Sequence, residues 1–171
     1  MFRMLKVLTL LVLCTTVISA QSSTKKTIEG VWKVTEIIVT GANASNVATP
    51  QPGLFIFAKK YYSVMWVPGN QPRSLFKGDS PTDEEKIAAY DSFVANSGTY
   101  EVDGSTLTLH PMVARSPNFM ASGVSKSELR IEGTTLWLTQ KNTDVIIRTG
   151  NTAAPSSGAA SETRLKLSRV E

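Results

Sequence analysis

Ile28-Glu29-Gly30-Val31-Trp32-Lys33-Val34-Thr35-Glu36-Ile37-Ile38-Val39-Thr40 is the stretch that decides the fold. Its residues are mostly β-branched, charged or aromatic, and the stretch carries no strong helix cap. The stretch therefore predicts one long β-strand. Gly30 lies two residues before Trp32, at the point where this strand begins.

Two apolar and aromatic runs follow, Leu54–Ala58 and Tyr61–Val67, and only Lys59-Lys60 separates them. Runs of this composition joined by two polar residues predict a β-hairpin. Since side chains alternate between the two faces of a strand, Tyr62, Val64 and Trp66 share one face. That face is the more apolar, and we expect it to point into the protein.

The second half of the chain predicts short strands at regular spacing. They cover Thr99–Val102, Thr106–His110, Glu128–Ile131, Thr135–Thr139 and Arg164–Val170. Gly104 and Gly133 lie in the turns of two hairpins, where positive φ is needed. By contrast, Gly41–Gly53 and Thr149–Thr163 have loop compositions. The second of these, low in complexity and with little to bury, predicts a mobile and dispensable loop.

One helix is expected, over Ser80–Ser97. Ser80 is a favourable N-cap, Pro81 suits the first helical position, acidic residues follow, and Gly98 is expected to end the helix. Its apolar stripe comprises Ile87, Tyr90 and Val94, with Phe93 beside it. Such a helix could brace the fold or form a lid over a ligand entrance.

The N-terminus predicts a secretory signal peptide over residues 1–20. Met1–Lys6 is basic, Val7–Ile18 is mostly apolar, and small residues precede a cleavage site after Ala20. The run is too short for a membrane span, and no second long apolar run follows. We therefore expect an exported protein, periplasmic or secreted, with a flexible lead-in at 21–27 and a single domain at 28–171.

Cys14 is not expected to carry a lipid, because Leu13 precedes it where lipoprotein signals need a small residue. Cleavage after Ala20 would remove Cys14, Arg3 and Lys6. The 18 basic, 14 acidic and single cysteine residues would then become 16 basic and 14 acidic residues, with no cysteine for a disulfide. This net charge of +2 does not indicate a nucleic-acid partner. About 150 residues suffice for one hydrophobic core.

Together these residues resemble the bacterial lipocalin-like domain family, over about Ile28 to Val170. The segments that carry the resemblance are Gly30-Val31-Trp32, Ser97-Gly98-Thr99-Tyr100, Leu109–Met120, Gly133–Thr139 and the terminal Arg169. The Thr-Asp-Tyr motif of the best-known lipocalins is missing, since Val145 follows Thr143-Asp144.

The resemblance implies an all-β fold, an antiparallel barrel of about eight strands with an apolar pocket. In such barrels the tryptophan at position 32 plugs the closed end, the glycine at position 30 allows another backbone to approach, and an arginine matching Arg169 stacks on the indole. We expect the predicted helix to lie across the opposite end. The family implies no particular activity, because a fold does not determine a function.

Catalytic and metal chemistry have few candidates in this sequence. One histidine and no cysteine in the mature chain make a metal site improbable, and no cofactor motif is present. His110 is either a strand-end side chain or a polar group at the barrel mouth, with Pro111 expected to end the strand pairing. Glu36 shares its parity with Trp32, so it either faces an apolar lumen or is turned outward by a local bulge.

The predicted ligand-binding residues are aromatic, with His110 as the polar member. They are Tyr62, Trp66, Tyr90, Phe93, Tyr100, His110 and Phe119. The same aromatics suit a filled core, because an eight-stranded barrel can be packed solid or can hold one small ligand. A cavity of about 300 Å³ or more would argue against a solid core.

Three functions remain open at this point. The first is an exported binding protein for a small hydrophobic or amphipathic molecule, without catalysis or cofactor. The second is a solid-cored structural or interaction domain. The third is a cofactor-free isomerase or cyclase in which Glu36 or His110 moves a proton. We expect a monomer or a weak dimer.

Overall fold

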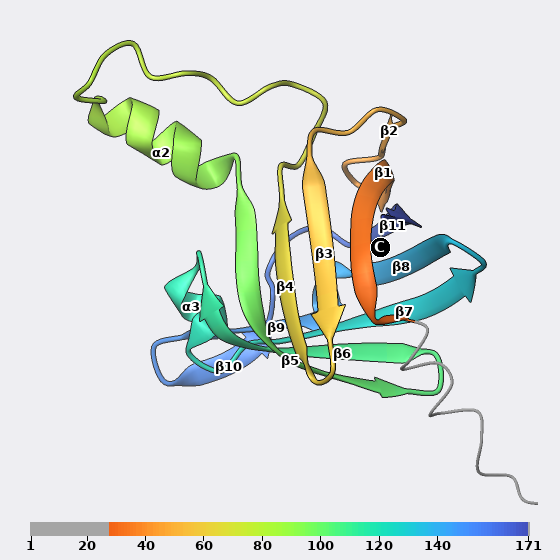
Figure 1. Cartoon of the computed structure of the whole chain (residues 1–171). Helices are drawn as coiled ribbons and strands as arrows, with labels where there is room; N and C mark the ends of the chain where they lie inside the picture. The colour runs from red at the N-terminus through yellow and green to blue at the C-terminus, as the bar shows by residue number, and fades with distance from the viewer. Residues whose placement is uncertain (1–27, 171) are drawn as a thin grey trace, which may run out of the picture.

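The computed structural model of the 171-residue chain describes residues 28–170. The predicted signal peptide, its cleavage site at Ala20 and the lead-in at 21–27 lie outside the described residues. Figure 1 shows a strongly curved sheet that closes on itself, with a helix projecting from one end.

Eight antiparallel strands form the closed barrel. They are β1 (Gly30–Gly41), β3 (Gly53–Ala58), β4 (Tyr61–Trp66), β5 (Val94–Asp103), β6 (Thr106–Ala114), β7 (Val124–Glu132), β8 (Thr135–Lys141) and β11 (Ser161–Arg169). Each pairs with the next in this order, and β11 pairs with β1 to complete the ring. The predicted all-β fold, an antiparallel barrel of about eight strands with one mid-chain helix, is confirmed.

Several shorter elements decorate this barrel. They are β2 (Ser45–Val47), which pairs with β1, the 4-residue helix α3 (Pro117–Met120), the 3₁₀ turn η1 (Asn142–Asp144), β9 (Val145–Thr149) and β10 (Thr152–Pro155). The prediction of a loop over Thr149–Thr163 is wrong for residues 152–155 and 161–163, which form strands. Residues 152–155 pair with the adjacent β9, and residues 161–163 pair with β1 and β8, although the composition of this segment carries no strand signal.

The barrel closes where Arg169 lies over Trp32. The two residues are register partners on β11 and β1, and the guanidinium carbon is 4.2 Å from the centroid of the indole. The indole nitrogen donates to the carbonyl of Ile28 at 2.7 Å, and Arg169 Nη1 donates to the carbonyl of Glu29 at 2.6 Å. Gly30, the first residue of β1, has a φ of +133°. Residues with a side chain rarely adopt this backbone conformation. The predicted stacking of Arg169 on Trp32 is therefore present.

A β-bulge in β1 decides which way Glu36 points. The pairing of β1 with β11 shifts between Val34 and Glu36, so that Trp32, Val34 and Ile37 are buried. Glu36 is only partly buried, and Ile38 no longer shares the parity of the inward residues. Of the two alternatives for Glu36, the structure has the bulge rather than a carboxylate in the lumen.

The mid-chain helix α2 (Asp83–Asp91) is shorter than predicted and is capped by Thr82 rather than Ser80. Thr82 and Glu85 form a reciprocal capping box, with bonds of 3.3 and 2.9 Å. Residues 94–103, expected to continue the helix as far as Ser97, instead form β5 and pair with both β4 and β6. Only Thr99–Asp103 alternates polar and apolar side chains, so residues 94–97 carry no strand pattern of their own and are held in β5 by the ladders with β4 and β6.

The predicted role of the helix as a cap is not what the structure shows. The side chains of Ile87 and Tyr90 are 61% and 46% exposed, and α2 contains no buried residue. The helix does leave the barrel at the end opposite Trp32, as expected, but it extends outward there (Figure 1). Two arginines hold it: Arg73 donates to the carbonyl of Ala89 and to Ser92, and Arg115 donates to the carbonyl of Tyr90.

Gly98 does not end a helix, and Pro111 does not end the ladder between β5 and β6. The two residues are register partners, and the pairing shifts between Ser97 and Gly98, leaving an extra residue on β6. A Cβ on Gly98 would overlap the carbonyl oxygen of His110 and the backbone of Pro111 and Met112. Glycine is needed here because the bulged strand presses against it.

We predict that Trp32→Ala and Arg169→Ala each destabilise the fold and that their effects are not additive. Loss of a buried tryptophan costs about 3–5 kcal/mol, and the stacked pair should contribute a coupling of about 0.5–2 kcal/mol. Urea unfolding of the single and double variants measures this coupling. Arg164→Ala, which removes a guanidinium stacked on Trp137 outside the core, is the matched control. Its effect on the free energy of unfolding should simply add to that of Trp32→Ala. Additivity of the Trp32 and Arg169 variants would refute the coupling.

Candidate functional site

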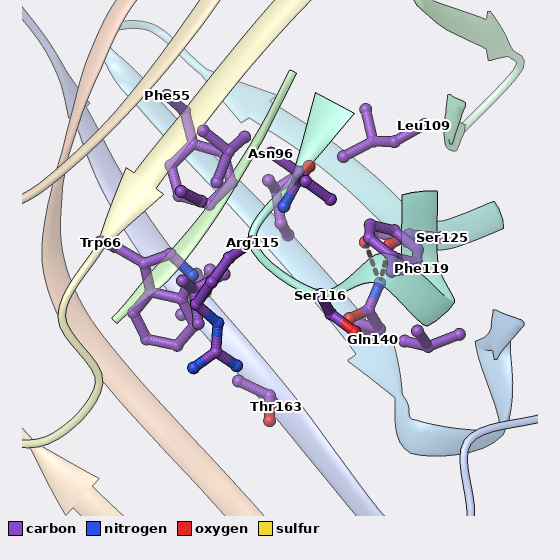
Figure 2. Close-up of a pocket in the computed structure, with 18 of the residues that line it drawn as sticks. Phe55, Trp66, Asn96, Leu109, Arg115, Ser116, Phe119, Ser125, Gln140 and Thr163 are labelled. Atoms are coloured by element: carbon purple, nitrogen blue, oxygen red, sulfur yellow. Dashed lines mark hydrogen bonds between the residues drawn. The ribbon is translucent and has the colours of Figure 1, made fainter. Parts of the chain in front are cut away.

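A cavity of about 480 Å³ opens at the end of the barrel opposite Trp32. Its rim comprises Trp66 at the end of β4, Val94 at the start of β5 and Ala114 at the end of β6. Trp32 lies near the start of β1 and so belongs to the other end. Figure 2 shows side chains from several strands and from α3 converging on this cavity.

The deeper walls of the cavity are apolar. They are formed by Phe55, Val64, Leu107, Leu109, Leu138 and Leu165, and Trp66 and Phe119 add aromatic faces nearer the mouth. The Trp32 half of the barrel holds large buried side chains, among them Trp32, Phe57 and Tyr100, whereas small residues, among them Ala114, Ser125 and Ser127, line the cavity in the other half. The barrel is thus filled at one end and hollow at the other.

One polar cluster lies where β7 changes partners. The first residues of β7 pair with β9, and Glu128–Glu132 pair with β8. Gln140 of β8 spans the divergence. Its amide nitrogen lies 2.5 Å from the hydroxyl of Ser125 and 3.2 Å from that of Ser127, and both serines are buried. Side-chain hydrogen bonds thus replace the missing backbone ladder on this wall (Figure 2).

Asn96 supplies a second polar group. Its side-chain oxygen is buried, and among the described residues it has no hydrogen-bond partner. Asn96 lies between Val64 and Ala114 in the sheet, and all three residues line the cavity. Buried polar atoms are nearly always satisfied in folded proteins, so this amide has bonding capacity left for a molecule in the cavity.

Arg115 brings a positive charge to the cavity and directly follows the last residue of β6. Its side chain is 26% exposed, and its guanidinium carbon lies 4.3 Å from the centroid of the Tyr90 ring. Nη1 donates to the carbonyl of Tyr90 and is 4.0 Å from a carboxylate oxygen of Asp91. The hydroxyl of Tyr90 donates in return to the carbonyl of Arg115 at 3.1 Å.

A second hollow, of about 570 Å³, lies outside the barrel between α2 and residues 67–77. Its lining includes the charged side chains of Arg73, Lys77, Glu84 and Glu85, and its other wall is a connecting loop. We regard the smaller barrel cavity as the candidate site, because barrel strands form most of its walls and, among the residues that the structure describes, a single charged side chain lines it.

Of the seven predicted ligand-binding residues, the structure brings two to the cavity, Trp66 and Phe119. Tyr62 and Tyr100 are buried in the filled half instead. Tyr100 packs edge-to-face on Phe57, with ring centroids 5.1 Å apart. Burial, and to a lesser degree the negative charge of Glu29, raise the pKa of Tyr100 to about 12. The inward face of β4 was predicted correctly, since Tyr62 and Val64 are buried. The position of each residue along the barrel axis could not be read from the alternation.

The remaining predicted residues lie outside the cavity lining. Tyr90 is exposed on α2 and reaches the site only through Arg115. Phe93 lies under the guanidinium of Arg73, whose carbon is 5.1 Å from the ring centroid. His110 pairs with Thr99 inside β6, with parity opposite to that of buried Leu109. Glu36 is turned away by the bulge, so the two proposed proton carriers do not meet at the cavity.

The polar cavity-lining residues that sequence reasoning missed include Asn96, Arg115 and Gln140. Asn96 was assigned to a helix, and Arg115 follows Pro111, where the strand was expected to have ended. Gln140 directly follows the predicted strand Thr135–Thr139 and belongs to β8. Alternation continued past Pro111 from buried Leu107 and Leu109 would have assigned Ala114 to the outer face, because the bulge that brings it to the cavity was not foreseen.

Burial also sets a testable property of Tyr62. Among the described residues its hydroxyl has no hydrogen-bond partner, and burial raises its pKa above the ordinary value of 10.0. The neutral phenol is therefore favoured in the folded state. Its contribution to stability is complete below pH 10 and is lost as pH rises from there toward the folded-state pKa.

We predict that Tyr62→Phe raises the free energy of unfolding by about 1 kcal/mol at neutral pH, because it removes a buried hydroxyl without a partner. The variant should also lose less stability than the parent protein between neutral pH and about pH 11. Urea unfolding across this pH range measures both effects. Tyr61→Phe, at a half-exposed position next in the chain, is the control and should change neither. A loss of more than about 1 kcal/mol in Tyr62→Phe would show that the hydroxyl is bonded.

Within residues 28–170, His, Cys, Asp and Glu side chains form no group of three suited to holding a metal ion. The helices of this part of the chain are too short or too polar to cross a lipid bilayer. Comparisons of the chain with protein-family models, with curated proteins and with solved structures found no match.

Proposed function

We propose that this protein binds a small hydrophobic or amphipathic molecule in the open half of its barrel. The observation that carries the proposal is the cavity of about 480 Å³ enclosed by strands. Pockets for small ligands in proteins typically measure about 300–1,000 Å³ and combine apolar walls with a few polar groups. The cavity has both features.

The polar groups support binding rather than an unused void. An empty cavity in a protein is ordinarily lined by apolar groups alone. Here the unsatisfied oxygen of Asn96, the Ser125–Gln140 cluster and Arg115 all border one apolar space. The stacking of Arg169 on Trp32 supports a further proposal, that the chain is related to lipocalin-like barrels.

Neither alternative function has a comparable observation in its favour. A wholly solid core does not agree with a cavity of this size. The isomerase or cyclase hypothesis relied on Glu36 or His110, and neither borders the cavity.

We predict that Ala114→Trp blocks binding of a neutral apolar probe, N-phenyl-1-naphthylamine, while Val113→Trp does not. Ala114 lines the cavity, whereas its neighbour Val113 is 60% exposed on the outer wall. Fluorescence titration of the parent protein should show saturable binding. The indole at position 114 should weaken it about tenfold or more, a loss of about 1.4 kcal/mol.

Circular dichroism melts of both variants show whether each has folded. Equal binding by the two variants, or no binding by the parent protein, would contradict the proposal. Loss of binding in Val113→Trp alone would place the probe on the outer wall and would contradict it equally.

We also propose that the protein is exported and that its signal peptide is removed after Ala20. Support comes from the basic, apolar and small-residue order of residues 1–20. N-terminal sequencing of protein recovered outside the cytoplasm should begin at Gln21. A sequence beginning at Met1 or Phe2 would contradict the proposal.

A further inference from the structure

Arg115 is the one ionisable side chain among the described residues that line the barrel cavity. The other lining residues are apolar or neutral and polar. A charge beside an apolar space interacts more strongly than one in water, because little solvent screens it. The cavity therefore presents a positive electrostatic potential on one side of its lining.

The guanidinium of Arg115 also has unused donors. An arginine carries five N–H groups in a fixed plane. Among the described residues only Nη1 has hydrogen-bond or ion-pair partners, namely Tyr90 and Asp91. Nε and Nη2 together form the edge that a carboxylate binds with two parallel hydrogen bonds. Figure 2 shows Arg115 among the cavity residues, on the same side of the view as Trp66 and Thr163.

The negative charges near Arg115 do not cancel this potential. The carboxylate of Asp91 is 4.0 Å from Nη1, its side chain is 69% exposed, and it lies on α2 rather than in the cavity lining. Solvent screens an exposed carboxylate of this kind. A negatively charged group inside the cavity would approach Arg115 from the less solvated side.

We propose that Arg115 selects ligands with an anionic head group, and specifically a carboxylate carried on an apolar tail. The tail would occupy the space between Phe55, Leu107 and Leu138, and the head would bind Nε and Nη2 of Arg115. This inference rests on the proposed binding function and adds the chemical class of the ligand.

The test compares three ligands built on a ten-carbon chain: decanoate, decan-1-ol and decyltrimethylammonium. Each ligand is titrated at pH 8 into the full mature chain with bound N-phenyl-1-naphthylamine, and displacement of this probe is measured. The ligands are kept below any concentration at which they form micelles. The parent protein should bind decanoate about tenfold or more tightly than decan-1-ol, and the cation most weakly. In Arg115→Gln the preference for decanoate over decan-1-ol should fall to about twofold or less, while the affinity for decan-1-ol is kept.

Two control variants separate recognition from a structural role. Arg73→Gln removes the other arginine that holds α2 but leaves the cavity lining intact. It should keep the preference for decanoate. Arg115→Lys retains the charge without the planar pair of donors, so the preference should be intermediate.

Each outcome decides the proposal. Equal binding of decanoate and decan-1-ol by the parent protein overturns carboxylate selection and leaves apolar binding intact. Equal loss of preference in Arg73→Gln and Arg115→Gln overturns it too, since Arg115 would then act by positioning α2. If the probe binds and none of the three ligands displaces it, this inference fails alone; if the probe does not bind, the binding function fails with it.

Discussion

The stack of Arg169 on Trp32 is the interaction on which the rest of the barrel depends. It joins the first barrel strand to the last, and the ring of eight strands closes only when β1 and β11 meet. The neighbouring carbonyls of Ile28 and Glu29 bind the indole and the guanidinium, so the stack is fixed in position as well as in distance. Contacts between residues so far apart in sequence form late and at high entropic cost. The stack of Arg169 on Trp32 and the two hydrogen bonds at this junction offset that cost.

The barrel is closed at the Trp32 end and open at the other, and two β-bulges determine which residues face its interior. The bulge in β1 places Ile37 inside and removes Glu36 from the interior. The bulge opposite Gly98 brings Ala114 to the cavity and places Arg115 beside it. A small residue where a large one could have packed leaves volume unfilled, and the arginine that follows supplies charge. One irregularity of pairing thus contributes both a small residue and the charged residue of the site, beside the polar groups of Asn96 and Gln140.

The fold was predictable because its signals are local. Strand patterns located at least part of each of the eight barrel strands, Gly104 and Gly133 adopt the positive φ expected of their turns, and the face of β4 was assigned correctly. The site was less predictable because it depends on pairing between distant strands. A bulge reverses the parity beyond it and leaves no mark in composition, as Glu36 and Ala114 both show. Nor does composition distinguish a filled aromatic core from a hollow one, which is why Tyr62 and Trp66 were predicted to have the same role.

The sheet continues past the barrel through β9 to β10, and this affects how the chain behaves at high concentration. The four residues of β10 are exposed, and among the described residues the strand pairs with β9 alone, so its outer edge offers unpaired backbone groups to another molecule. Such edges can template intermolecular sheets and aggregates. Here the edge is short, and it ends in Pro155, which has no N–H to donate. A second chain could form few hydrogen bonds there, so strand-by-strand aggregation has little on which to begin.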